Sequence, residues 1–163
     1  MPHINVDEVP WREFVSPKGA FRGRYRELSL ALGAKKDAGV GAGGHPFDVA
    51  LEVLAPGETC CPFHAHAAQW EFFYILSGAG TVRRNGEHFT VGPGDAILHP
   101  PGEAHQIRNT GTVELRYLII ADNPPHDPCV YPDSRKAHVL VPGGEKLVRY
   151  DALDHLDYFD GEE

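Results

Sequence analysis

Three titratable side chains stand at the edge of the most apolar segment of the sequence. His64 and His66 precede the run EFFYILSG, and Glu71 opens it. Residues two apart on a strand point to the same face, about 6.6 Å from each other, so the two imidazoles can reach one ion. A buried, unpaired carboxylate would be costly, whereas a divalent cation keeps it ionised and keeps the imidazoles neutral. These residue types predict a metal site.

The spacing between His66 and Glu71 requires the chain to bend if both side chains are to reach the same ion. The two residues are five apart, which is the wrong parity for the same face of one unbroken strand. We therefore expect a bend in the segment AAQW, residues 67–70, that returns Glu71 to the side of the histidines. An isolated H-x-H pair is more often an ordinary core or surface pair, so a second cluster has to support the prediction.

A second cluster follows in GDAILHPPGEAHQIRN, residues 94–109. The two segments together resemble the two motifs of the cupin superfamily, G-x5-H-x-H-x(3,4)-E-x6-G and G-x5-P-x-G-x2-H-x3-N. The first motif is matched, with one extra residue after the first glycine, by Gly57, His64, His66, Glu71 and Gly78. The second is matched without departure by Gly94, Pro100, Gly102, His105 and Asn109. The resemblance covers roughly residues 47–121.

The resemblance implies a small antiparallel jelly-roll β-barrel. It also implies a metal centre in which His105 joins His64, His66 and Glu71. Three imidazoles and a carboxylate are borderline ligands that suit one divalent transition metal, and they do not choose among Mn, Fe, Co, Ni, Cu and Zn. We interpret Asn109, in the segment RNTG, as a turn residue.

The elements that must position these residues are short strands joined by turns. FDVALEV alternates apolar and polar residues, and Asn85-Gly86 is a strong hairpin signal between two strand-like runs. EFFYILSG is apolar on both faces, which predicts a strand covered on both sides. We expect one all-β domain over residues 1–163: N-terminal strands and a Gly-rich loop (1–46), the barrel core (47–121), and a Pro-rich crossing loop with an acidic tail that includes a short helix (122–163).

The composition of the chain limits the kinds of molecule that it is expected to bind. The net charge of −8 argues against nucleic acid or an anionic membrane as the main partner. Three cysteines are too few for a disulfide framework, and the first residues lack the apolar run of a signal peptide, so we expect a cytoplasmic protein. A small barrel cannot easily cover both faces of residues 71–76, which predicts a homodimer.

The chemistry of the site favours a small polar substrate with adjacent oxygens. An octahedral ion with four protein ligands keeps two positions for such a ligand and acts as a Lewis acid. The chain is similar to small bacterial cupins of the sugar-phosphate isomerase-like group, which implies isomerase or epimerase activity on a sugar or sugar phosphate. A metal-dependent dioxygenase and a non-catalytic sugar-binding protein are the alternatives.

Other residues are candidates for the surroundings of the metal, and none of them is identified as the general base. The pocket candidates are His99, Tyr117 and Phe73. The thiols of Cys60 and Cys61 precede the ligands, and the segment 122–133, with His126, Asp127 and Asp133, could cover the pocket. Arginines could hold a phosphate, although solvated strand charges are the more common role of such residues; they are Arg22, Arg24, Arg26, Arg83, Arg84 and Arg116.

Overall fold

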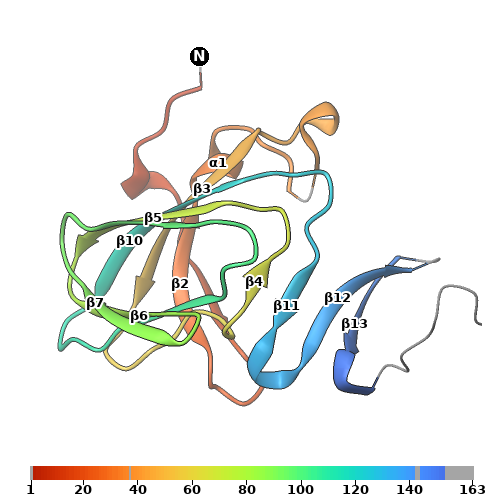
Figure 1. Cartoon of the computed structure of the whole chain (residues 1–163). Coiled ribbons are helices and arrows are strands. Elements are labelled where there is room, and N and C mark those ends of the chain that lie inside the picture. Colours follow the sequence, from red (N-terminus) through yellow and green to blue (C-terminus); the bar gives the residue numbers. More distant parts are fainter. Residues whose placement is uncertain (1, 37, 142–143, 153–163) are drawn as a thin grey trace, which may run out of the picture.

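The computed structural model in Figure 1 describes residues 2–36, 38–141 and 144–152. Antiparallel strands form three sheets: a six-stranded sheet of order β1-β2-β3-β10-β5-β8, a three-stranded sheet β7-β6-β9, and a four-stranded sheet β13-β12-β11-β4. The predicted all-β jelly-roll class is confirmed. Within the described residues the sheets face one another without joining into one continuous hydrogen-bonded cylinder.

The strands are β1 (Arg12–Val15), β2 (Arg22–Glu27), β3 (Phe47–Leu54), β4 (Ala65–His66), β5 (Glu71–Ser77), β6 (Gly80–Arg84), β7 (Glu87–Val91), β8 (Ala96–His99), β9 (His105–Arg108), β10 (Leu115–Asp122), β11 (Cys129–Tyr131), β12 (Lys136–Val141) and β13 (Gly144–Arg149). The helical elements are short: η1 (Val6–Glu8), α1 (Leu28–Ala31), η2 (Val40–Ala42), η3 (Pro132–Ser134) and η4 (Tyr150–Ala152). In the described part of the chain, no helix has the length and apolar character needed to cross a membrane.

The core lies between the six-stranded and the three-stranded sheet. On β5 the residues Glu71, Phe73 and Ile75 are buried, as the sequence pattern predicts for the inner face. Phe73 and Ile75 pack in one apolar cluster with the inward side chains of neighbouring strands. The members of this cluster are Leu54, Phe73, Ile75, Val82, Val91, Ile97, Ile107, Leu115 and Tyr117.

Two motif residues hold the turns around this core. Gly78 follows β5 with φ of +81°, and a Cβ there would lie 2.2 Å from the carbonyl oxygen of Glu114, so only glycine fits. Asn109 is fully buried: its amide donates to the carbonyl oxygens of Leu54 and Val113 at 2.7 and 2.8 Å. Its Oδ1 accepts from Gly111 N at 2.9 Å, so the turn interpretation is right and the residue also ties two strand ends together.

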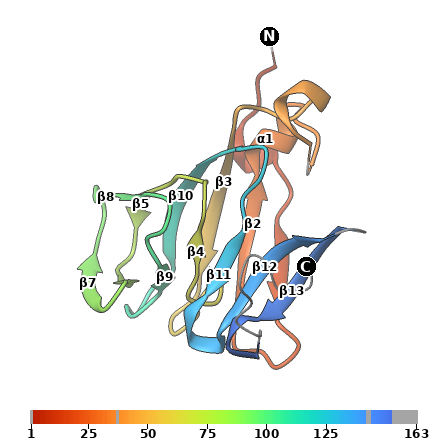
Figure 2. The same ribbon diagram turned by 45° about the vertical axis from the view of Figure 1, so that its right-hand side comes forward.

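The region after β10 differs from the predicted crossing loop. It contains β11, which pairs with β4, and the β12–β13 hairpin, and Figure 2 shows β4, β11, β12 and β13 in that order. Prolines are compatible with these strands because Pro128 precedes β11 and Pro132 begins η3, so neither has to donate within a ladder. The predicted terminal helix lies mainly in residues 153–163, outside the described residues.

The outer face of β5 is not covered by the described residues of one chain, which is the condition on which the predicted homodimer rests. Tyr74 and Leu76 on β5 are 39% and 42% exposed, and Leu98 on β8 is 51% exposed. Phe72 pairs with Leu98 and Ile120 across the sheet, which makes the exposed apolar surface continuous. Apolar patches of this kind often mark protein–protein interfaces.

We therefore expect the chain to form a dimer through this face. Light scattering should give twice the chain mass of 17.9 kDa at micromolar concentration. The variant Leu98→Lys should give the monomer mass because a buried, unpaired ammonium opposes association. Val113→Lys is the control, since Val113 is equally exposed but is not part of this face. A monomeric wild-type protein would contradict the prediction.

Candidate metal centre

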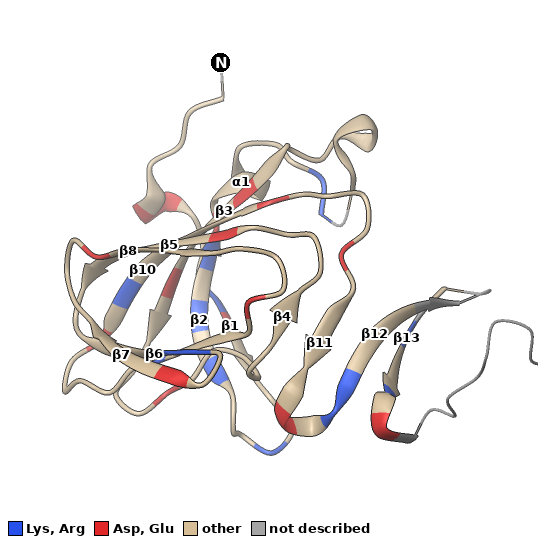
Figure 3. Ribbon diagram, viewed as in Figure 1, with Lys and Arg blue, Asp and Glu red and all other residues tan. Residues whose placement is uncertain are grey.

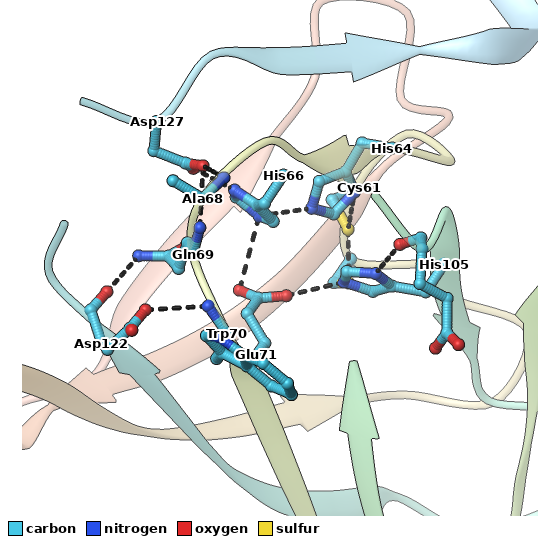
Figure 4. Close-up of polar contacts among 12 residues, drawn as sticks. Cys61, His64, His66, Ala68, Gln69, Trp70, Glu71, His105, Asp122 and Asp127 are labelled. Atoms are coloured by element: carbon cyan, nitrogen blue, oxygen red, sulfur yellow. Dashed lines mark hydrogen bonds and ion pairs between the residues drawn. The ribbon is translucent and has the colours of Figure 1, made fainter. Parts of the chain in front are cut away.

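The structure brings four predicted residues together from all three sheets. His64 directly precedes β4 and His66 ends it, in the four-stranded sheet; Glu71 begins β5 in the six-stranded sheet, and His105 begins β9 in the three-stranded sheet. Their ligand atoms all lie within 4.8 Å of one another (Figure 4). Glu71 and His105 are buried, while His64 and His66 are half-buried.

The bend expected at residues 67–70 is present and is held by two acidic side chains, one at the end of β10 and one in the segment that follows it. Asp127 Oδ1 accepts hydrogen bonds from the backbone of Ala68 at 2.8 Å and of Gln69 at 3.0 Å. Asp122 Oδ1 accepts from Trp70 N at 2.8 Å. The bend places Glu71 beside His66, with 3.7 Å between His66 Nε2 and Glu71 Oε1.

The Nδ1 atoms of the three histidines point away from the centre. Nδ1 of His64 lies 2.8 Å from Pro62 O, and Nδ1 of His105 lies 3.0 Å from Glu103 O. A carbonyl oxygen can only accept, so these Nδ1 atoms carry the proton and donate it. Nδ1 of His66 donates to Asp127 Oδ2. All three Nε2 atoms are therefore left to face the centre, as in carboxylate– and carbonyl–histidine–metal arrangements.

The inward atoms fit a cation. Nε2 of His64 and Nε2 of His66 are 3.1 Å apart, and Nε2 of His105 is 2.6 Å from Glu71 Oε2. Two neutral Nε2 lone pairs and a carboxylate repel one another at these distances unless a proton or a metal ion lies between them. A divalent ion would serve all four donors at once, and its binding would release any proton held there.

The protonation states favour the metal-binding forms. Burial, followed by the charge of His105, lowers the pKa of His64 to about 4, which keeps the imidazole neutral. Burial acts to raise the pKa of Glu71, but the hydrogen bond with His105 and the nearby histidines outweigh it and lower the pKa. The described residues thus fit one divalent ion with borderline ligand preference.

Beside the four donors lies a cavity of about 300 Å³. Its walls include three of the ligands, His64, His66 and Glu71, together with Phe14, Glu52, Cys60, Cys61, Phe73, Tyr117 and Ile119. Two of the three pocket candidates, Phe73 and Tyr117, therefore line it. Burial, and then Cys60, raise the pKa of the Tyr117 phenol above its usual range, so it stays protonated.

The third pocket candidate, His99, lies behind the centre instead of in the cavity wall. Its ring stacks on that of His105, with 4.0 Å between centroids and 9° between planes. Its Nδ1 lies 3.0 Å from Glu103 Oε1. The sequence did not determine the orientation of the His99 side chain. In the structure its ring packs against the His105 ring and holds it in place.

The vicinal thiols lie in the cavity wall. Cys60 Sγ and Cys61 Sγ are 3.1 Å apart, and Cys61 Sγ is 3.8 Å from His64 Nδ1, which faces away from the centre. The hydrogen bond with Cys60, together with burial, raises the pKa of Cys61 above its usual range. A protonated thiol is a poor metal ligand, so this position favours packing.

Sequence reasoning missed the roles of Glu52 and Asp127. The sequence places Glu52 on the polar side of FDVALEV, but that side turns inward, while Leu51 and Val53 face the side that carries Arg24 and Arg26. Both guanidinium groups stack on Trp11, so N-terminal residues cover this face. A glutamate on the polar half of an alternating strand gives no signal that its side is the interior.

We expect Asp127→Asn to weaken metal binding by 10- to 100-fold, because outer carboxylates that orient a histidine ligand have effects of this size. Affinity is measured by competition with a chromogenic chelator. Asp122→Asn is the matched control, since it also holds the bend but touches no ligand. Equal losses in both variants would show that only the bend matters.

Comparisons with known proteins agree with this geometry. The cupin domain family matches residues 50–121. The oxalate-binding protein of Thermotoga maritima is 36% identical over 67 residues, 41% of this chain and 54% of that protein. A 5-aminosalicylate 1,2-dioxygenase of Comamonas sp. is 27% identical over 136 residues, 71% of this chain and 35% of that protein. The chain spans about half the length of the first curated relatives it matches.

A solved structure extends the similarity to nearly the whole chain. A protein of Acidithiobacillus ferrooxidans with a provisional sugar phosphate isomerase name superposes with a TM-score of 0.78 at 24% identity. The match covers 93% of this chain and 92% of that one. At this identity the likeness bears on the fold alone.

Proposed function

We propose that the chain, whose residues 50–121 match the cupin domain family, is a metal-dependent isomerase of a small hydroxycarbonyl compound such as an uncharged sugar. The observation that carries the proposal is the cavity beside the four donors. It is large enough for a small ligand and contains a carboxyl group, Glu52, and a protonated phenol, Tyr117, outside the predicted ligand set. A bound divalent ion would supply Lewis acidity to adjacent substrate oxygens.

The charges around the cavity disfavour a phosphorylated substrate. A second cavity of about 260 Å³ shares Glu52 and Ile119 with the first, and its other charged wall residues are Glu27, Lys36 and Asp48. Glu27 is paired with Arg12, but Asp48 and the ionised fraction of Glu52 still face a single ammonium group, so this wall offers a phosphate dianion no net attraction. An uncharged polyol with adjacent oxygens meets no such penalty.

The arginines that the sequence suggested as phosphate ligands lie elsewhere. Figure 3 shows the basic positions along β2, and the described residues lining the metal-side cavity include no Lys or Arg. Arg24 pairs with Glu114 at 2.7 Å, Arg26 with Asp7 at 2.9 Å, and Arg83 with Asp133 at 2.6 Å. Because these three guanidinium groups are already paired with carboxylates, they do not support a phosphate-binding site built from arginines.

A dioxygenase is the second candidate, because the aromatic rings of Phe14, Phe73 and Tyr117 form much of the cavity wall. Such walls suit an aromatic ring as well as a sugar ring. The similarity to a 5-aminosalicylate 1,2-dioxygenase supports the same candidate. A sugar-binding protein without turnover would need the cavity and the metal but no proton transfer.

One experiment separates the three candidates. Protein loaded with Mn²⁺, Zn²⁺ or Fe²⁺ is incubated in heavy water with neutral aldoses and ketoses and with their phosphates. We expect NMR to show hydrogen exchange at the carbon next to the carbonyl of a neutral compound, and chelation to abolish it. Oxygen consumption with a catechol and no exchange would favour the dioxygenase. Tight sugar binding with neither reaction would favour a binding protein.

A further inference from the structure

Glu52 lies in the middle of the inner face of the six-stranded sheet. Its cross-strand neighbours are Tyr25 on β2 and Tyr117 on β10, and Tyr117 in turn pairs with Ile75 on β5. Residues opposite each other in a sheet share a face, so the Glu52 side chain points to the side of the buried Tyr117 and Ile75. It lines both the cavity beside the metal donors and the adjoining one.

The Glu52 carboxyl group has no partner within the described part of the chain. Its Oε2 is buried without a hydrogen bond, and no ion pair reaches the side chain. Glu27, which also lines the second cavity, likewise has an Oε2 without a hydrogen bond, but that atom lies 2.8 Å from the Arg12 guanidinium in an ion pair, which Glu52 lacks. Buried polar groups are nearly always paired, so an orphaned carboxyl group in a ligand-sized cavity points to a partner that arrives with a ligand.

The other proton-active groups in the cavity wall are less suited to accept a proton. Tyr117 and Cys61 hold their protons because burial and neighbouring groups raise the pKa of each. Glu71 and the Nε2 atoms of His64 and His66 face the metal position. Burial first, then Glu71 and Glu27, raise the pKa of Glu52 to about 7, which is near the value that favours transfer in both directions at neutral pH.

We propose that Glu52 is the group that moves the proton between the two carbons of a hydroxycarbonyl substrate, an inference that rests on the proposed function. Its carboxylate takes the proton from the carbon that carries the hydroxyl group. The electron pair of that C–H bond forms the C=C bond of an enediolate, and the carbonyl π pair moves to oxygen. The hydroxyl proton passes to the neighbouring oxygen of the enediolate. Return of the carbon-bound proton from Glu52 to the former carbonyl carbon then gives the isomer and restores the carboxylate.

Proton counting tests this without turnover. Acetohydroxamic acid loses one proton when it chelates a metal. Glu52 is largely ionised at pH 8 in the free protein, and we expect the anionic probe beside it to raise its pKa further, so that it receives and keeps this proton. We expect Mn²⁺-loaded wild-type protein at about pH 8 to release almost no proton to the buffer on binding the probe. Glu52→Gln, which has the same shape, should release about one. Calorimetry in two buffers of different ionisation enthalpy gives the number. Glu27→Gln is the control and should behave as wild type.

The outcomes separate the two proposals. Equal proton release by wild type and Glu52→Gln would overturn the role of Glu52 and leave the proposed function standing. A metal-loaded wild type that does not bind the probe would overturn the proposed function and this inference with it. With a substrate that exchanges hydrogen, Glu52→Gln should lower the exchange rate by about 10²- to 10⁴-fold while keeping its metal. Unchanged exchange would also overturn the inference.

Discussion

Replacing Glu71 by glutamine should weaken binding of a divalent metal ion by roughly 100- to 1000-fold. Sites with four protein ligands bind zinc with about 10–16 kcal/mol, so one ligand accounts for roughly a quarter of that. The change keeps the shape of the side chain and removes the only anionic donor of the group. Competition with a chromogenic chelator measures this loss of metal affinity, as it does for Asp127→Asn. The loss should be larger in Glu71→Gln than in Asp127→Asn.

Glu52→Gln is the matched control for this prediction. It removes a carboxylate from the same cavity wall but from outside the four-donor group, so its metal affinity should fall far less than that of Glu71→Gln. Metal removal should lower the melting temperature of the wild type, since an ion present at 1,000 times its Kd adds about 4 kcal/mol to the free energy of unfolding. The melting temperature of Glu71→Gln should respond far less, and equal responses would place the metal elsewhere.

In the metal-free protein, Glu52 should make the free energy of unfolding fall as the pH rises. Below pH 4.5 the carboxyl group is protonated in the folded and the unfolded chain and has no effect. Between pH 4.5 and about 7 the unfolded chain loses this proton while the folded chain keeps it. Above that range the loss is complete and amounts to about 3 kcal/mol.

The comparison with Glu52→Gln isolates this effect. Urea unfolding of both proteins, with chelator present, should give a difference in unfolding free energy that grows from pH 4.5 to about 7 in favour of the variant and then stays constant. Glu87→Gln, at an exposed position, should show no such growth. A difference that does not change with pH would mean that Glu52 titrates normally in the folded protein. The charged or titratable groups that share the two cavities or a cross-strand position with Glu52 are Tyr25, Glu27, Lys36, Asp48, Cys60, Cys61, His64, His66, Glu71 and Tyr117.

Local pattern predicted individual turns and the meeting of His64, His66 and Glu71, whereas the barrel and the place of His105 came from the resemblance to the cupin motifs. The Asn85-Gly86 pair predicts a two-residue hairpin, and β6 and β7 are joined by those two residues with Asn85 at φ of +51°. The parity of His66 and Glu71 predicts a bend, and the chain bends there. Each of these inferences depends on neighbours along the sequence, where spacing fixes geometry.

The parts that the sequence did not reveal depend on contacts between distant segments. Asp127 reaches His66 only because β11 pairs with β4, and the proline-rich sequence around it gave no strand signal. Glu52 faces inward because N-terminal residues cover the opposite side of β3, so an alternating strand had two acceptable orientations. The apolar pattern of β5 predicted that both of its faces are covered. A single sequence does not show which of the two faces is covered within the chain and which by a second chain.

The four donors come from three separate sheets, and this has a consequence for the rate at which the fold comes apart. An ion held there would act as a reversible cross-link that closes the long loop from His64 to His105 and the shorter one from Glu71. The sheets could then separate only after the ion had left. The lifetime of the folded chain would follow the off-rate of the metal, and backbone amides in β4, β5 and β9 would become open to solvent exchange together.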